Sequence, residues 1–136
     1  MATVSVRYIV NDVDEAIAFY TEHLGFREQL HPADTFAMLT HGDLRLLLSA
    51  PSLQGGGGQA MPDGTNPEPG GWNRFSLEVT GLEDLAAQLR GAGIRLRSDI
   101  ISGVGGNQLL VEDPAGNLVE LFEPTRPEAW LEGHSS

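Results

Sequence analysis

Apolar and polar residues alternate from residue 4 to residue 10, and a period of two predicts a β-strand with one apolar face. Apolar residues then recur at helical spacing over residues 13–24, and Gly25 ends that pattern. Asp12 and Glu15 have the spacing of a capping box, which predicts that the helix begins there. The strand alternation comes from Val4, Val6, Tyr8 and Val10, and the helical stripe from Val13, Ile17, Tyr20 and Leu24.

Three short strands are expected next, at residues 26–30, 35–40 and 44–49, the last two joined by a tight turn at 41–43. Residues 51–71 follow without periodicity. Their glycine and proline content predicts a linker or a mobile loop.

The whole pattern then repeats, because residues 73–79 resemble 4–10 and residues 116–122 resemble 42–48. Thr80 and Glu83 again suggest a cap, and Gly93 again ends a helix. Each half therefore reads βαβββ, which predicts an α+β protein. Strands are expected at 94–97, 107–112 and 118–123, with a turn at 113–116.

The repeat divides the chain into a first module at 1–50, the 51–71 segment, a second module at 72–124 and a tail at 125–136 with one expected helical turn near 127–131. We expect one domain overall, because two copies of one unit usually stack to share a core. The seam between such copies is a natural place for a ligand.

Composition removes several classes of function. The 136 residues carry a net charge of −11 with only 8 Lys+Arg, which argues against nucleic acid and anionic membrane surfaces as partners. Cysteine is absent, so disulfides, thiolate metal sites and thiol nucleophiles are excluded. No apolar run is long enough to span a membrane, and no signal peptide precedes the first strand. A cytoplasmic protein is expected.

Two runs resemble the vicinal oxygen chelate superfamily, which contains glyoxalases, bleomycin-resistance proteins and extradiol dioxygenases. One extends from Asp12 through Ala16–Tyr20 to His23–Phe26, and the other is Asp113–Leu121. The resemblance covers residues 4–124. It implies two βαβββ modules that form an open, incompletely closed eight-stranded barrel with helices on the convex faces, and a homodimer.

Metal-dependent members of this superfamily place ligands on the first and last strand of each module. The repeat transfers those positions to Ser5, Leu46, Arg74 and Glu120. Only Glu120 is a plausible ligand, because leucine has no donor atom, arginine has no lone pair and serine is a weak neutral ligand. No metal is therefore expected. Arg74, placed opposite Glu120 across the cleft, would take over the electrostatic role of the ion.

Arg7 is two residues from Ser5, so its side chain should lie on the same side of the strand. Together with the other inward positions this predicts a pocket with a polar floor and apolar walls. A self-satisfied ion-pair network that only stabilises the barrel is the equally weighted alternative. The floor would consist of Arg7, Arg74, Gln108 and Glu120, and the walls of Trp72, Phe36, Leu48 and Phe122.

Neither the histidines nor the glycine-rich segments predict a cofactor site. His23, His31, His41 and His134 do not form a ligand set. His23 is expected near a helix C-terminus, where an imidazolium is favourable. Residues 54–59 and 103–107 lack the lysine and the strand–loop–helix setting of a phosphate loop.

Three functions remain open. The favoured one is a metal-free protein that captures a small organic molecule. The alternative is a lyase or dioxygenase of the glyoxalase type with a divalent metal, and a third is a metal-free enzyme with Glu120 as base. The acidic surface favours a cationic ligand, whereas the inward arginines favour an anionic one.

Overall fold

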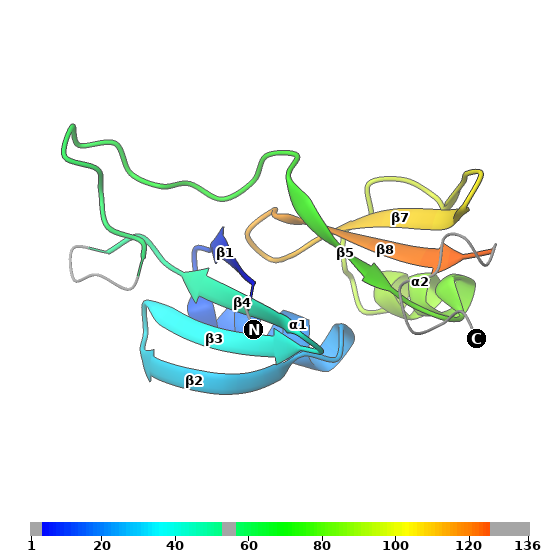
Figure 1. Cartoon of the computed structure of the whole chain (residues 1–136), viewed down its shortest axis with the longest axis horizontal. Coiled ribbons are helices and arrows are strands. Elements are labelled where there is room, and N and C mark those ends of the chain that lie inside the picture. The colour runs from blue at the N-terminus through cyan, green and yellow to red at the C-terminus, as the bar shows by residue number, and fades with distance from the viewer. Residues whose placement is uncertain (1–3, 53–56, 126–136) are drawn as a thin grey trace. The chain divides into compact units, whose positions relative to one another are not determined.

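The computed structural model describes residues 4–52 and 57–125, and the chain divides into two compact units (Figure 1). Of these described residues, the first unit holds 4–52, 57–71 and the short segment 113–117. The second holds 72–112 and 118–125. A turn that belongs to the second half of the sequence is thus part of the first unit.

The first unit is a four-stranded sheet with the strand order β1-β4-β3-β2 and one helix. β1 and β4 are parallel, and the other neighbours are antiparallel. Its elements are β1 (Ser5–Ile9), α1 (Val13–His23), β2 (Arg27–Ala33), β3 (Phe36–His41) and β4 (Leu44–Ser49).

The second unit repeats this topology with the order β5-β8-β7-β6, and β5 and β8 are its parallel pair. Both sheets are open, so the expected α+β class with two βαβββ repeats is confirmed. The elements are β5 (Arg74–Glu78), α2 (Leu82–Gly91), β6 (Ile101–Ser102), β7 (Gly106–Glu112) and β8 (Leu118–Pro124).

The strand expected at residues 94–97 is wrong. Only Leu96 forms an isolated bridge there, to Val111 of β7, and the strand β6 comes later at Ile101–Ser102. The main-chain amide of Arg97 still donates to the Leu110 carbonyl at 2.9 Å. The segment therefore lies beside β7 without becoming a full strand.

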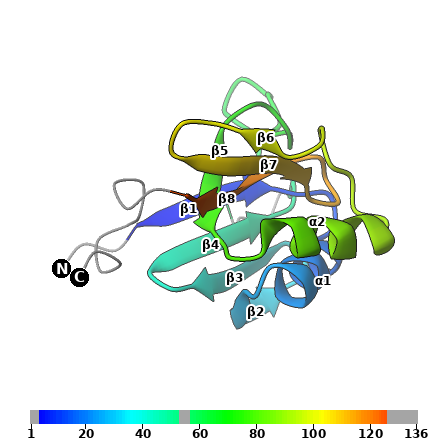
Figure 2. The same cartoon turned by 90° about the vertical axis from the view of Figure 1, so that its right-hand side faces the viewer.

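Each helix packs on one face of its own sheet, α1 against β2, β3 and β4 and α2 against β8 (Figure 2). The covered face of the first sheet is apolar and fully buried, with Leu39, Leu46 and Leu48 at its centre. Side chains alternate along a strand, so Arg7, Arg45 and their neighbours project from the opposite side. We call that side the helix-free face: Ser5, Arg7, Arg45, Leu47, Met38 and Thr40 on the first sheet, and Arg74, Ser76, Glu120, Phe122, Gln108, Leu110 and Glu112 on the second.

The two helices begin in different ways. The Asp12 carboxylate accepts a hydrogen bond from the Glu15 amide at 3.0 Å, so the predicted cap of α1 is confirmed. The predicted Thr80–Glu83 cap of α2 is wrong, because Gly81 is the N-cap residue and provides no side chain. The Glu123 carboxylate of β8 instead accepts from the amides of Gly81, at 2.8 Å, and Leu82, at 3.3 Å.

Residues 57–71 contain neither helix nor strand. Among the helices of the described ranges, none combines the length and the apolar character that a membrane span requires. The helical turn expected near 127–131 and His134 lie outside the described residues.

Candidate functional site

An ion pair occupies the helix-free face of the second sheet. Arg74 donates from Nε and Nη2 to Oε1 of Glu120, at 3.2 and 3.1 Å. Ser76, directly opposite Glu120 in the β5–β8 register, donates to Oε2 at 2.9 Å. Both carboxylate oxygens are therefore engaged, although the Glu120 side chain is still 17% exposed. The sequence analysis expected Arg74 and Glu120 on opposite sides of a cleft. They lie instead on neighbouring strands of one sheet.

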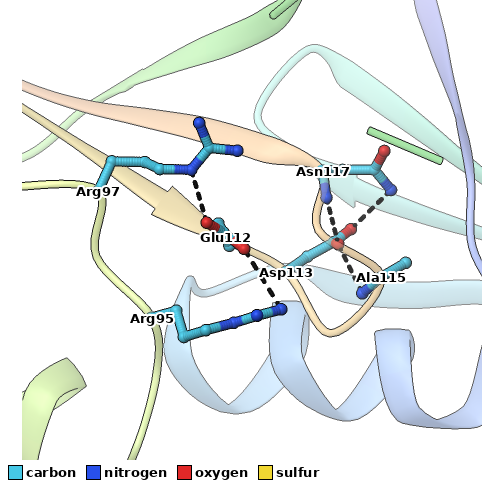
Figure 3. A network of polar contacts seen from close by, with 6 residues as sticks. All are labelled: Arg95, Arg97, Glu112, Asp113, Ala115 and Asn117. Carbon is cyan, nitrogen blue, oxygen red and sulfur yellow. Dashed lines mark hydrogen bonds and ion pairs between the residues drawn. The ribbon is translucent and has the colours of Figure 1, made fainter. Parts of the chain in front are cut away.

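A second polar cluster on the same face was missed by the sequence analysis. Glu112 of β7 forms ion pairs with Arg95 at 3.3 Å and with Arg97 at 2.5 Å (Figure 3). The guanidinium carbon of Arg97 lies 5.3 Å from the ring centre of Trp72. This cation–π distance is favourable, and Trp72 remains 69% exposed. Glu112 is four residues after Gln108, so both side chains lie on the same face of β7. This alternation along β7 is the sequence signal that could have identified Glu112.

The other predicted ligand residues divide between the two sheets. Gln108 and Phe122 are directly opposite each other on β7 and β8, on the face that carries Glu120. Arg7 and Phe36 lie on the helix-free face of the first sheet.

Leu46, expected at a metal-ligand position, and Leu48, expected in an apolar wall of the pocket, do not lie on that face. Both are fully buried on the helix-covered side. The β1–β4 register puts Leu47 opposite Arg7, as the β5–β8 register puts Glu120 opposite Ser76. The alignment of the repeats was therefore displaced by one residue in β4, and such a slip moves every side chain to the other face.

The residues at the family's ligand positions do not fit a divalent metal. Leu47, which replaces Leu46 in the corrected register, also lacks a donor atom, and Ser5 is exposed on the strand beside it. The lone pairs of Glu120 are directed to Arg74 and Ser76. Within the described ranges, no group of three or more His, Asp or Glu residues is arranged to hold an ion.

A buried network in the first unit is centred on Asp113. Its carboxylate accepts a hydrogen bond from the Tyr20 hydroxyl at 2.8 Å. It also accepts from the Ala115 and Asn117 amides at 2.9 Å and from the Asn117 side chain at 3.1 Å (Figure 3). Asn117 also donates to the Ile9 carbonyl at 2.8 Å. The network fastens the 113–117 turn to β1 and α1.

Burial dominates the ionisation of both acidic groups in this network. Burial, followed by the nearby Asp113 carboxylate, raises the pKa of Tyr20 well above its usual value. Burial also raises the pKa of Asp113, and the hydrogen bonds from Asn117, Tyr20 and Ala115 offset part of that rise. Asp113 is almost completely buried, so we assign it a structural role.

Each described histidine has a different neighbour. The His31 ring is 3.5 Å from the Asp14 carboxylate. The His41 ring centre lies 5.0 Å from that of Phe26, and His23 is in the last turn of α1, as expected.

Solved structures of similar fold come from several functional classes. A member of the glyoxalase/bleomycin resistance protein/dioxygenase superfamily from Sphaerobacter thermophilus DSM 20745 has a TM-score of 0.71 at 25% identity, with 90% of this chain and 97% of that chain covered. For the lactoylglutathione lyase from Agrobacterium tumefaciens the TM-score is 0.68 at 22% identity, with 90% and 92% covered. TnmS3, an antibiotic binding protein from Streptomyces sp. CB03234, has a TM-score of 0.67 at 21% identity, with 92% and 97% covered. The last two likenesses show the fold alone.

No curated protein matches the sequence significantly. A family model named Glyoxalase, described as the Glyoxalase/Bleomycin resistance protein/Dioxygenase superfamily, matches residues 3–121. That match spans nearly the whole repeat, from the first strand to β8, and it agrees with the two βαβββ units. The chain therefore belongs to the glyoxalase/bleomycin resistance protein/dioxygenase superfamily.

Proposed function

We propose that this protein binds a small organic molecule without a divalent metal, and that the helix-free face of the second sheet takes part in binding. The observation that carries the proposal is the Arg74–Glu120–Ser76 arrangement. The resemblance implies that in metal-dependent members of the superfamily a side chain at the position of Glu120 coordinates the ion. Here a guanidinium and a hydroxyl engage both of its oxygens, so the fixed positive charge stands where the metal would act.

The surroundings of this pair suit an organic ligand. Phe122 and Gln108 offer an apolar surface and an amide on the same face, and the exposed Trp72 ring offers an aromatic surface. Aromatic and apolar side chains with a few polar groups are typical of small-molecule sites. Capture without chemistry also agrees with the similarity in fold to the antibiotic-binding protein TnmS3.

The competing function is a metal-dependent lyase or dioxygenase. It would require Glu120 to leave Arg74 and Ser76, and removing a half-buried carboxylate from its cation is costly. A metal-free enzyme with Glu120 as base would have to break hydrogen bonds from the same two partners, Arg74 and Ser76.

The test combines metal analysis with thermal shifts on protein purified without chelators. We expect metal far below one equivalent, no rise in Tm with Ni, Zn, Mn or Fe, and a rise with a member of a panel of aromatic carboxylates, aromatic amines and glycopeptide antibiotics. A ligand at 100 times its Kd stabilises the folded state by about 2.7 kcal/mol. Near-stoichiometric metal would contradict the proposal, and turnover of a panel compound without metal would favour the enzyme with Glu120 as base.

Matched arginine variants connect the binding to this site. Arg74→Gln is expected to weaken the panel ligand about tenfold or more, since a lost charged hydrogen bond costs about 1.5–3 kcal/mol. Arg90→Gln is the control, because Arg90 also pairs with a carboxylate, Asp99, but lies on the exposed side of α2. Equal affinities for the two variants would exclude the Arg74 face.

A further inference from the structure

Three arginines of the first sheet have no carboxylate partner in the described part of the chain. All eight Lys+Arg residues of the sequence are arginines. Arg74, Arg90, Arg95 and Arg97 form ion pairs, whereas within the described ranges Arg7, Arg27 and Arg45 form none. In a protein with 19 acidic residues, unpaired cations are unexpected.

These three arginines share the helix-free face of the first sheet. Arg45 of β4 lies directly between Ser5 of β1 and Thr40 of β3, and Arg27 of β2 is opposite Thr40. Arg7 is two residues beyond Ser5 on β1, hence diagonal to Arg45 and within reach of a long side chain. Like charges placed this close are unfavourable by themselves, so an anion between them would be stabilising.

The next row across the sheet begins with Arg7 and is otherwise apolar. Arg7 is opposite Leu47, Leu47 is opposite Met38, and Met38 is opposite Leu30. Leu47 and Met38 are half-buried, and Leu30 is 53% exposed. The face therefore presents a row with guanidinium and hydroxyl groups beside a row of aliphatic side chains.

Gly57 lies against the head of Arg7. At its φ of +88°, a Cβ atom on this residue would collide with the Arg7 guanidinium. A Cβ atom on Gly58 would likewise collide with the Ala50 carbonyl, and the Gly58 carbonyl accepts a hydrogen bond from the Ser52 amide at 3.1 Å. The main chain at Gly57 therefore closes one side of the Arg7 guanidinium.

We propose that the helix-free face of the first sheet binds an anionic molecule with an apolar body. Its carboxylate, sulfonate or phosphate group would lie between Arg7 and Arg45, where planar guanidiniums can donate paired hydrogen bonds. The apolar body would cover Leu47 and Met38. This inference goes beyond the proposed function, because it concerns the first unit alone and names the chemical class of the ligand.

The probes for the test are three naphthalene derivatives that differ in charge: 2-naphthalenesulfonate, 2-naphthalenemethanol and a 2-naphthylmethylammonium salt. Calorimetry is expected to give at least tenfold tighter binding of the sulfonate than of the neutral alcohol, and weaker binding still of the cation. Amide resonances of β1, β3 and β4 are expected to shift in two-dimensional NMR spectra. Raising the salt concentration should weaken the sulfonate selectively.

Two pairs of variants test the assignment. Arg7→Gln and Arg45→Gln should each weaken the sulfonate at least fivefold and leave the alcohol unchanged, whereas Arg90→Gln should change neither. Gly57→Ala should weaken the sulfonate by displacing Arg7. Gly64→Ala is its control, because Gly64 has nearly the same φ, +89°, but open space around its Cβ position. Circular dichroism and Tm confirm that each variant folds.

Equal binding of alcohol and sulfonate, or no binding of the sulfonate, would overturn the inference. So would sulfonate binding that responds to Arg74→Gln and to neither Arg7→Gln nor Arg45→Gln, an outcome that leaves the proposed function standing. Conversely, stoichiometric metal in the purified protein would end the proposed function without bearing on the first sheet.

Discussion

Tyr20 of α1 is a buried tyrosine whose pKa is raised in the folded protein. Its buried hydroxyl donates to Asp113, and burial raises its pKa well above 10.0. The chain contains two tyrosines and neither cysteine nor lysine. Above pH 8 and below the range where arginine loses its proton, tyrosines are therefore the only side chains that titrate.

Alkaline pH should consequently destabilise the fold through Tyr20. Above about pH 10 the tyrosine of the unfolded chain loses its proton while the folded one keeps it, so the folded state binds more protons and the free energy of unfolding falls as pH rises. The slope should approach about 1.4 kcal/mol per pH unit. Urea unfolding between pH 8 and 11.5 measures it.

A phenylalanine variant separates this effect from general alkaline damage. Tyr20→Phe should lose about 1 kcal/mol at pH 7 with its hydrogen bond, but show a much flatter alkaline slope. The assignment is wrong if Tyr20→Phe and the unaltered protein have equal slopes.

At the level of elements, α2 depends on a carboxylate from a distant strand. Glu123 of β8 accepts from the first amides of the helix, and the N-cap Gly81 has a positive φ of 67° and no side chain to do so. The cap therefore also ties the helix to β8.

Replacing Glu123 should lower the free energy of unfolding more than replacing Glu83, which the sequence indicated as part of the cap. Glu123→Gln is expected to lower the free energy of unfolding by about 1–2 kcal/mol, since a charged acceptor at a helix N-terminus is lost. Glu83→Gln, in the first turn of the same helix, should cost about 0.5 kcal/mol or less. Thermal unfolding of the two variants at low salt makes the comparison, and a larger loss for Glu83→Gln would restore the sequence-based cap.

Periodicity predicted most of the elements because their patterns are local. The strand expected at 44–49 is β4 as observed, and the Asp12 cap of α1 was identified from two residues. What the sequence missed depends on partners far away: the Glu123 cap, and β6, which lies after the alternating residues 95–97.

The candidate site was predicted only in its second half. The repeat identified the Arg74–Glu120 pair, because it placed both residues at positions where the resemblance implies metal ligands. In β4, by contrast, Leu46, Leu47 and Leu48 are all apolar, so a period of two cannot say which of them faces the helix. Only the hydrogen-bond register shows which of these leucines faces the helix. The same register places Arg45 on the helix-free face. Arg95 and Arg97 were missed because their partner Glu112 lies on another segment.

For the whole molecule the dominant quantity is a net charge of −11. Excess charge of one sign opposes a compact state through self-repulsion. The ion pairs of the described residues are mostly near the surface, where each contributes little. Repulsion between like charges should therefore outweigh attraction within the ion pairs.

The homodimer expected from the resemblance stays a prediction.

Salt should accordingly stabilise the protein. Between 0.02 and 0.5 M sodium chloride, the free energy of unfolding is expected to rise by about 1 kcal/mol as repulsion is screened, which corresponds to roughly 3–5 °C in Tm for a chain of this size. Calorimetry at pH 7 measures this change. Potassium chloride at the same ionic strength is the control, because screening predicts the same rise for both salts and a different rise would indicate binding of a particular cation.

The placement of the 113–117 turn bears on how this protein can be dissected. A half-length fragment that stops within residues 57–71 would contain every strand of the first sheet and all of α1. It would nevertheless lack the acceptor of the Tyr20 hydroxyl and the donor to the Ile9 carbonyl. The two halves are copies in sequence but not autonomous pieces, so severing the chain between them deprives the first half of part of its own interior.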